Sequence, residues 1–557
     1  MIGVLCRPED VAVFGEFFEL FKTPWELYQP ARDYEVVLTA TGQTLELDTG
    51  VLVIYGSEAT AYDARIAAGA GQRRQGGTVN YRGARLPIYR ALLTFVERFR
   101  GSAQVRTEDG AVAGVRIRVG HSTVVRFGYD LAEEVRSLLW KGQPAEHADV
   151  PTLNLHIAML RELIVEAGVP FVEIPATPAG HPFAVCLTHD IDFAGIRYHS
   201  LDHTMWGFLY RATVGTLRRM YRGRLTPARC AQSWRAAALL PLVYLGWMPD
   251  FWEPFDWYLR VEHGLPATYF LIPFKRRPGV HVTAPRAARR GAGYDVDDIA
   301  DSAVRLQQEG CELAVHGIDA WHDAELGRAE LARIAALRGR GRIGIRMHWL
   351  CGNEHTPRFL EEAGFTWDAS LGYNETVGFL NGSTQPFLPG GATTLLELPL
   401  HIQDGALFYP TRLDLSEADA WPRCVRLIDE VSRHGGALSV LWHDRSHAPE
   451  RFWGDFYIRL VEALKARGAW FATAGEVIDW FARRRSVRFE RTTGGVRLRC
   501  GGGEINPPLR VRVHHQRAGA GPARWIDVPW TGRDVNDVER GLASAGVATR
   551  PSTTAGV

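Results

Sequence analysis

The chain has 557 residues, 46% hydrophobic and 23% charged, a composition typical of a soluble globular protein with about two to three domains. A formal net charge of +1 gives no global electrostatic reason to expect nucleic acid or an acidic membrane as a partner. The seven cysteines are scattered without a CxxC pair, which argues against a disulfide framework and for a reducing compartment.

The start of the chain shows no charged leader followed by a long apolar stretch. The longest apolar run, residues 236–248, contains Pro241 and is too short to cross a bilayer. We therefore expect a cytoplasmic protein, with a location peripheral to the inner face of the membrane as an alternative.

Residues 1–150 are predicted to form a separate, smaller α/β domain of unknown role. A helical pattern covers 11–21, a second helix opens at Tyr129-Asp130-Leu131, and the arginines and glycines at 73–77 indicate a flexible loop. This domain carries no phosphate-cradling glycine motif and no clustered ligands. Its predicted strands are 2–5, 34–38, 51–54 and a hairpin of 115–119 with 124–127.

Residues 151–485 alternate short apolar strands with amphipathic helices, which is typical of a mostly parallel sheet. An irregular (β/α) barrel of about seven to eight strands is the most economical arrangement. The alternating segments of 486–535 predict a small β-rich module, and the composition of 536–557 predicts a disordered tail. The predicted barrel strands are 183–187, 268–272, 311–315, 343–347, 366–369, 396–400, 438–442 and 470–472.

The barrel is interrupted at about 195–262 by a predicted helical insertion rich in aromatic residues and arginines. One interpretation of residues 200–258 is an amphipathic lid that touches a membrane surface or a lipid-linked glycan. The other is a helical excursion packed on the barrel with solvated arginines, since aromatic patches on helices are often simply core. The sequence leaves both open.

Two carboxylates follow the first barrel strand. Asp190 and Asp192 stand two positions apart, so on an extended backbone their side chains leave from the same side. Carboxylates this close repel each other unless a cation or a proton lies between them. They suggest a metal ligand beside a general base, whereas an isolated Asp-x-Asp more often caps a turn or a helix.

Other predicted strands of the barrel also end in reactive side chains, and chemistry in such barrels gathers at the carboxyl ends of the strands. One Asp and two His are a familiar ligand set for zinc or a similar divalent ion, which acidifies water enough to attack a carbonyl near neutral pH. A second carboxylate can then accept a proton, and a further His can protonate the leaving group. The residues at these strand ends are His316, His322, Arg346, His348, Asp368, Ser370, His401 and His443.

Residues 183 to about 480 resemble the polysaccharide deacetylase domain, carbohydrate esterase family 4. The family's first motif, Thr-Phe-Asp-Asp-Gly, corresponds to Thr188-His189-Asp190-Ile191-Asp192, and its second, His-Ser/Thr-x-x-His, to residues 316–322. The later motifs correspond to Arg346-Met347-His348-Trp349, to residues 368–373 and to Leu441-Trp442-His443. The order of the motifs and their strand context both match.

The resemblance implies a carbohydrate substrate and a divalent metal cofactor, preferably zinc. It assigns Asp190 as the base, Arg346 as the residue that orients it and His443 as the general acid. Ile191 replaces the family's metal-binding Asp, so Asp192 is the nearest substitute, and the roles of Asp190 and Asp192 could be exchanged. The further assignments are His316 and His322 as metal ligands, and Asp368, Ser370, His348 and Trp349 as substrate-binding residues.

The function predicted from the resemblance is a hydrolase that removes N- or O-linked acetyl groups from a sugar or polysaccharide. It would act on carbon–nitrogen bonds other than peptide bonds, or on ester bonds. One alternative is a non-catalytic carbohydrate-binding protein on a degenerate barrel. Another is a glycosidase, which requires two carboxyl groups roughly 5–10 Å apart across a sugar-sized cleft.

Overall fold

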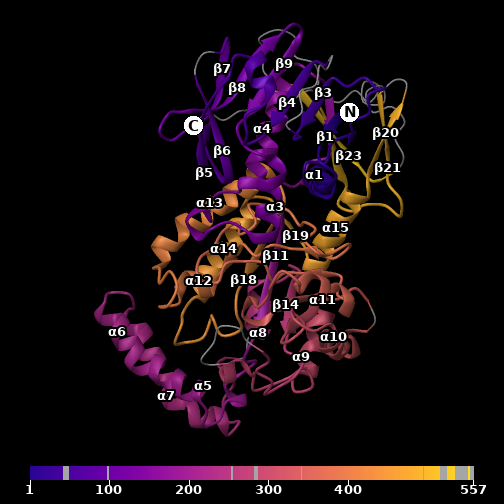
Figure 1. Cartoon of the computed structure of the whole chain (residues 1–557). Coiled ribbons are helices and arrows are strands. Elements are labelled where there is room, and N and C mark those ends of the chain that lie inside the picture. Colours follow the sequence, from indigo (N-terminus) through magenta and orange to yellow (C-terminus); the bar gives the residue numbers. More distant parts are fainter. Residues whose placement is uncertain are drawn as a thin grey trace. The chain divides into compact units, whose positions relative to one another are not determined.

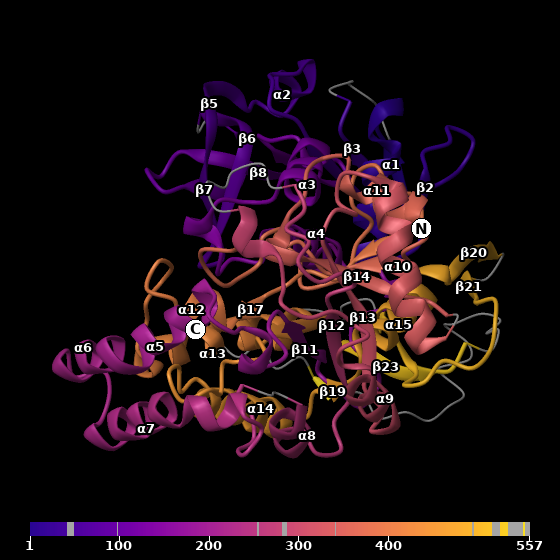
Figure 2. The same ribbon diagram turned by 90° about the horizontal axis from the view of Figure 1, so that it is seen from below.

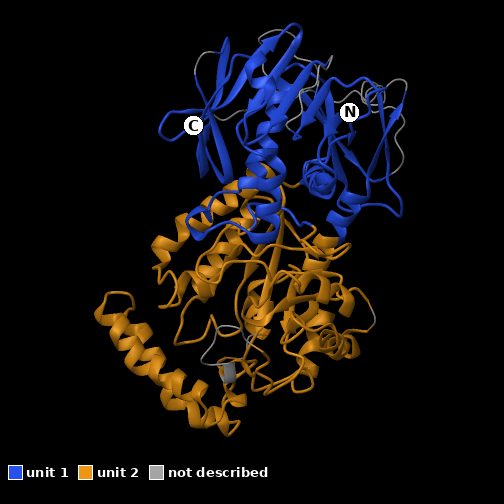
Figure 3. Cartoon of the chain, in the orientation of Figure 1, with its two compact units in different colours: residues 1–180, 381–387, 479–557 blue, residues 181–380, 388–478 orange. Residues whose placement is uncertain are grey.

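The computed structural model describes residues 1–41, 49–96, 99–252, 255–280, 287–339, 341–492, 495–514, 524–532 and 550–551. The chain forms two compact units (Figure 3). Unit 1 comprises residues 1–180, 381–387 and 479–557, and unit 2 comprises residues 181–380 and 388–478. In the described part of the chain, every helix is too short or too polar to span a bilayer.

Unit 2 is built on a parallel sheet whose strands alternate with helices (Figure 1). This arrangement fits the predicted irregular (β/α) barrel, and no pairing among the described residues joins the two end strands. In spatial order the strands are β16 (Leu396–Glu397), β15 (Trp367–Asp368), β14 (Gly344–Met347), β13 (Glu312–Gly317), β12 (Ala267–Leu271), β11 (Ala184–Ile191), β18 (Ala437–Leu441) and β17 (Ile402–Gln403), and β19 (Trp470–Phe471) also pairs with β11.

Strand β11 is buried along its whole length because it lies between β12 and β18 in the middle of the sheet. Its Val185 and Leu187 belong to the main hydrophobic core, where Leu360, Leu427 and Leu460 are also buried. Helices therefore cover the sheet and hold its strand ends in place. The helices outside the insertion are α9 (Ala300–Gln308), α10 (Ala324–Arg338), α11 (Thr356–Ala363), α12 (Asp404–Phe408), α13 (Glu417–His434) and α14 (Gly454–Ala466).

The segment between β11 and β12 forms a helical excursion, in the region of the predicted insertion. Most of it is a hairpin of helices that extends away from the sheet of unit 2 in two views (Figures 1 and 2). The helices of the whole excursion are α5 (His203–Tyr210), a π-helical segment η4 (Arg211–Gly215), α6 (Thr216–Tyr221), α7 (Pro227–Tyr244) and α8 (Phe255–Val261).

Unit 1 contains a mixed sheet in which parallel pairing joins β2, β1, β3, β4 and β9, and antiparallel pairing joins the remaining strands. Its helices are α1 (Val11–Leu20), α2 (Ala61–Arg65), α3 (Leu131–Lys141) and α4 (Thr152–Glu166). The strands in spatial order are β2 (Trp25–Leu27), β1 (Ile2–Leu5), β3 (Val36–Thr39), β4 (Val51–Tyr55), β9 (Ser122–Phe127), β8 (Val112–Val119), β6 (Ala84–Val96), β5 (Gly69–Tyr81) and β7 (Gly101–Thr107).

The C-terminal strands also belong to unit 1. Strand β22 (Leu509–His514) pairs with β10 (Phe171–Glu173) and with β23 (Arg524–Trp530), so the predicted β-rich segment shares a sheet with residues far earlier in the chain. Helix α15 (Ala474–Ser486) begins in unit 2 and ends in unit 1, and the other elements here are β20 (Arg488–Thr492), β21 (Gly495–Arg499) and β24 (Arg550–Pro551). The domain boundaries that we predict at residues 150 and 485 would have to be tested by folding the separate segments, and they remain predictions.

One local prediction in unit 1 is wrong. The glycine- and arginine-rich residues 73–77 were expected to form a flexible loop, but they lie inside β5, paired with β6. The pairing shifts register between Gln75 and Gly77, and Gly76 takes a φ of +73°, so the glycines accommodate a bulge within the strand. The predicted disordered tail, 536–557, lies outside the described residues except for Arg550 and Pro551.

Candidate active site

The carboxyl ends of β11, β13, β14, β17 and β18 surround a cavity of about 610 Å³ in unit 2. Parallel strands present their carboxyl ends at one edge of a sheet, which explains why residues distant in sequence meet there. The lining residues are Asp190, Asp192, His316, His348, Trp349, Leu350, Asn374, Gln403, Gly405, Tyr409, Thr411, Arg412, Leu441 and His443.

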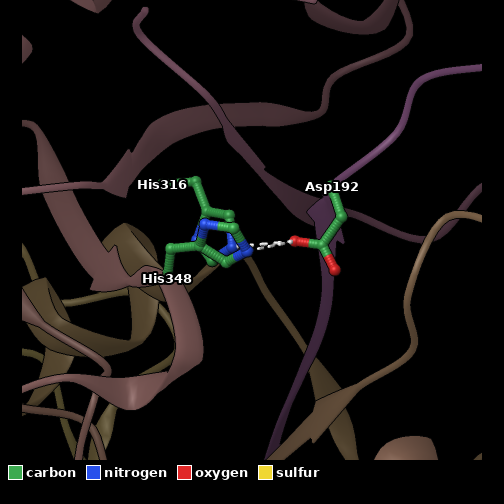
Figure 4. Close-up of side chains that lie close together, drawn as sticks. All are labelled: Asp192, His316 and His348. Carbon is green, nitrogen blue, oxygen red and sulfur yellow. Dashed lines mark hydrogen bonds and ion pairs between the residues drawn. The ribbon is translucent and has the colours of Figure 1, made fainter. Parts of the chain in front are cut away.

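Asp192, His316 and His348 form a compact cluster at this cavity. One potential ligand atom from each residue lies within 4.8 Å of the other two. Nε2 of His316 is 3.2 Å and Nε2 of His348 is 3.4 Å from Oδ1 of Asp192, and Figure 4 shows both rings directed at that carboxylate. Two imidazoles and a carboxylate are a donor set that suits zinc and similar divalent ions.

The tautomer of His316 follows from its second contact. Its Nδ1 lies 3.0 Å from the carbonyl oxygen of Arg346, so Nδ1 carries a hydrogen and donates it. In the neutral ring, Nε2 then presents a lone pair to the Asp192 carboxylate, and two lone pairs at this distance require a cation or a proton between them. The backbone contact thus leaves Nε2 of His316 available to a cation.

The ionisation of the other two cluster residues favours the same role. Burial lowers the pKa of His348 well below its ordinary value, which keeps the imidazole neutral and its lone pair free for a cation. Burial would raise the pKa of Asp192, but at the low pH where its carboxyl titrates the neighbouring histidines are protonated and hold this pKa well below its usual range, so Asp192 is ionised at neutral pH, where His348 is neutral. The cluster therefore presents one carboxylate and two nitrogen donors.

Asp190, two residues before Asp192, is held by an arginine. Nη1 of the fully buried Arg346 donates to Oδ1 of Asp190 at 3.0 Å and to the Thr188 hydroxyl at 2.8 Å, while Nε donates to the carbonyl of Ala369. The guanidinium also lies over the ring of Phe270, 4.3 Å from its centroid. Asp190 is therefore fixed in one orientation at the cavity wall.

His443 lies at the end of β18 and is fixed by Asp404, which follows β17. Nδ1 of His443 donates to Oδ1 of Asp404 at 2.5 Å, and the backbone amide of His443 donates to Oδ2 at 2.9 Å. Burial would lower the pKa of His443, but the Asp404 carboxylate outweighs it and raises the pKa to about 10. Because Asp404 occupies Nδ1, Nε2 is the nitrogen left for the cavity.

Two assignments made from the sequence do not fit this geometry. Nε2 of His322 lies 3.2 Å from Asp319, and His322 is not part of the cluster, whose third member is His348. Asp368 and Ser370 are buried and bonded to each other, and they are absent from the described lining of the cavity. The geometry therefore favours His348 over His322 as a ligand and gives Asp368 a structural contact.

Trp349 and Asn374 lie next to each other in the wall of the cavity. Trp349, assigned to substrate from the sequence, lines the cavity with 38% of its surface exposed, and its backbone takes the left-handed conformation with a φ of +65°. Asn374 donates from Nδ2 to the carbonyl oxygen of Trp349 at 3.1 Å, which holds this conformation. A partly exposed aromatic ring beside polar groups is a suitable surface for a sugar ring.

The chain matches solved structures, whereas its sequence matches neither a family model nor a curated protein. Among solved structures it is similar to the carbohydrate deacetylase Agd3, with 9% identity, 96% of this chain and 97% of that chain covered, and a TM-score of 0.38.

A second similar structure is a probable polysaccharide deacetylase from Pseudomonas aeruginosa, with 16% identity, 57% and 96% coverage and a TM-score of 0.34. A third is BA3943 from Bacillus anthracis, a CE4 family pseudoenzyme, with 13% identity, 54% and 67% coverage and a TM-score of 0.25. Polysaccharide deacetylases are thus among the structures that the chain resembles, at scores too low to transfer an activity.

Proposed function

We propose that this protein is a metal-dependent hydrolase that removes acetyl groups, N- or O-linked, from a sugar or polysaccharide. The observation that carries the proposal is the Asp192–His316–His348 cluster, which shares one cavity with two further fixed groups, Asp190 and His443. A metal-binding set, a candidate base and a candidate acid are the parts that hydrolysis of an amide or ester requires.

The donor atoms fit a divalent ion, for which we propose zinc. Asp192, His316 and His348 would hold it through one carboxylate oxygen and two Nε2 atoms, a set that leaves positions open. When bound, such an ion acidifies water and polarises the acyl carbonyl. The remaining steps are assigned to residues of the chain.

Asp190 accepts the proton of the water molecule that adds to the acyl carbon, since Arg346 fixes its carboxylate at the cavity wall. His443 then donates the proton on Nε2 to the leaving nitrogen or oxygen as the bond to the acyl carbon breaks. Asp404 stabilises the imidazolium beforehand, because it raises the pKa of His443 to about 10 against the effect of burial. The products are acetate and the freed amino or hydroxyl group of the sugar.

The geometry bears on both alternatives. A glycosidase needs two carboxyl groups across a sugar-sized cleft, but Asp190 and Asp192, the carboxylates among the described lining residues, lie beside the same atom, Nε2 of His316, at 3.8 and 3.2 Å. A binding protein on a degenerate barrel would not need a protonated histidine held by a buried carboxylate. The His443–Asp404 pair therefore favours a catalyst.

Acetate release from an acetylated amino-sugar oligomer, together with metal analysis of the purified protein, tests the proposal. We expect about one divalent ion per chain and release that falls by about 10²–10⁴-fold in His443→Ala, the usual contribution of a general acid. His434→Ala is a matched control, because His434 lies at the end of α13 and outside the described lining of the cavity. Absence of metal even after reconstitution, or unchanged release in His443→Ala, would refute the proposal.

A further inference from the structure

The helical hairpin of residues 201–250 carries a second apolar face whose large side chains are exposed in the described part of the chain. On α5 and η4, buried Met205, Phe208 and Ala212 pack into a hydrophobic cluster with residues of α7. The opposite side presents large side chains at spacings of four, four, three and four, which place them on one helical face. They are Trp206, Tyr210, Val214, Leu217 and Tyr221, with exposures of 58%, 50%, 43%, 45% and 93%.

Helix α7 and the turn after it repeat the pattern. Buried Leu240 and Val243 belong to the same cluster as the inner face of α5. Trp234 and Leu245 are exposed by 48% and 61%, with exposed Ala238 and Pro241 between them at helical spacing, and Trp247 is exposed by 75%. A helix that is apolar on both sides is normally buried on both. We call residues 201–250 the arm and the five exposed residues of α5–α6 the stripe.

The charge of the arm indicates the kind of surface that covers the stripe. Residues 201–250 contain seven arginines and two aspartates, a formal charge of +5 in a chain whose total is +1. Arg222 and Arg235 are exposed and form no ion pair with any described carboxylate. Arg218 lies beside the stripe, with its guanidinium 5.8 Å from the ring centroid of Tyr210. Unpaired arginines beside exposed aromatic rings match an anionic interface.

The arm is tied to the rim of the cavity. Nη1 of Arg224, just beyond α6, lies 2.8 Å from Oδ2 of Asp414. Asp414 follows the cavity-lining residues Thr411 and Arg412 by only a few positions. Arg219 also donates to the backbone carbonyls of residues 450 and 451. A surface that binds the arm would therefore lie close to the mouth of the cavity.

We propose that the arm docks on an anionic lipid surface, with the stripe in the interfacial layer and the arginines at the lipid phosphates. Arm-to-arm pairing of two copies is disfavoured, because a two-fold contact would bring the arginines of both arms together. The lipid surface instead takes up both the apolar stripe and the positive charge. This inference does not depend on the catalytic activity.

Sedimentation of the full chain with vesicles tests it. We expect binding to vesicles of phosphatidylcholine with phosphatidylglycerol, little binding to pure phosphatidylcholine, and weaker binding as salt rises. Trp206→Ala/Tyr221→Ala should lower the partition coefficient by at least about tenfold, because it removes two of the interfacial aromatic anchors. The control is Trp140→Ala, which removes a tryptophan with similar exposure, 53%, from α3 of unit 1.

A second pair of variants isolates the charge. Arg222→Glu/Arg235→Glu should abolish the preference for anionic vesicles, whereas Arg118→Glu, which reverses an exposed arginine of β8, should leave it unchanged. Circular dichroism checks that the helices persist in every variant. No sedimentation with anionic vesicles, or equal binding by Trp206→Ala/Tyr221→Ala, would overturn the proposal. So would a concentration-dependent dimer that this variant abolishes, because the stripe would then bind a second copy.

Discussion

At the scale of single residues, the pair of His443 and Asp404 makes the most direct prediction. His443 must be protonated to act as an acid, so activity should persist at neutral pH and fall as pH rises through its raised pKa. Asp404→Asn removes the charge that opposes burial, so the pKa of His443 should fall and the alkaline limb of kcat/KM should move to lower pH. Asp190 and Asp192 also raise the pKa of His443, but a bound cation would cancel part of their effect. Asp404 would then be the main cause of the raised pKa.

The control for this variant is Asp414→Asn, which removes a partly exposed carboxylate on the loop beyond the cavity-lining residues. The alkaline limb of the kcat/KM profile of Asp414→Asn should coincide with that of the wild type. An unmoved limb in correctly folded Asp404→Asn would mean that His443 does not titrate in the reaction.

The proposed role of His348 as the third metal ligand gives the second prediction. His348→Ala should lose the bound divalent ion, as should His316→Ala, because each removes one of two nitrogen donors at Asp192. His322→Ala should keep about one ion per chain, since Nε2 of His322 contacts Asp319. Elemental analysis of the three variants distinguishes these outcomes. If His322→Ala lost the metal and His348→Ala kept it, the ligand set assigned from the sequence, with His322 in place of His348, would be correct.

His348 and Asp404 show why the sequence identified only part of the site. The motifs placed Asp190, Asp192, His316 and His443 at strand ends, and all four line the cavity. His348 was visible at the end of its strand but was assigned to substrate, because spacing cannot tell which of two nearby histidines turns toward Asp192. Asp404 was missed because the strand before it, β17, has only two residues and no apolar run.

At the scale of elements, the sequence likewise predicted the strands with a clear apolar pattern and missed those without one. Strands of the barrel were recognised because they are continuous apolar runs buried on both faces. Strands β5 and β6 of unit 1 form a long antiparallel hairpin, but glycines and arginines along β5 hid it. Most residues of β5 are exposed, so burial imposes no apolar pattern on them, and backbone pairing alone defines the strand.

The turn after β14 gives an element-scale prediction. Trp349 and Leu350 adopt φ values of +65° and +54°, a conformation that costs roughly 1–2 kcal/mol for residues other than glycine. Trp349→Gly should relieve this strain and leave Tm close to that of the wild type. It should also raise KM several-fold with a smaller change in kcat, since Trp349 lines the cavity. Leu201→Gly, at a φ of +56° and outside the described lining of the cavity, should leave KM unchanged.

This prediction is checked by thermal denaturation and steady-state kinetics on the same preparations. A large fall in Tm for Trp349→Gly would indicate that the indole supports the fold. An unchanged KM would remove Trp349 from substrate contact. Either result would separate backbone strain from binding at this turn.

At the scale of the whole molecule, metal binding should stabilise one unit selectively. The cluster residues follow or end β11, β13 and β14, so a bound ion links three strands in the middle of the sheet of unit 2. Binding to the folded state alone stabilises by about 2.7 kcal/mol when the free ion is at 100 times its Kd. Chelation should therefore raise amide hydrogen exchange in these strands of unit 2.

Hydrogen exchange measured by mass spectrometry resolves the two units. The sheet of unit 1 supplies no residue to the cluster, so its exchange should be unaffected by chelator. In His316→Ala, chelator should change neither unit, because the metal is already lost. A uniform increase in both units of the wild type would show that the ion stabilises the chain as a single cooperative block, whereas no increase in β11, β13 and β14 would place the bound metal elsewhere.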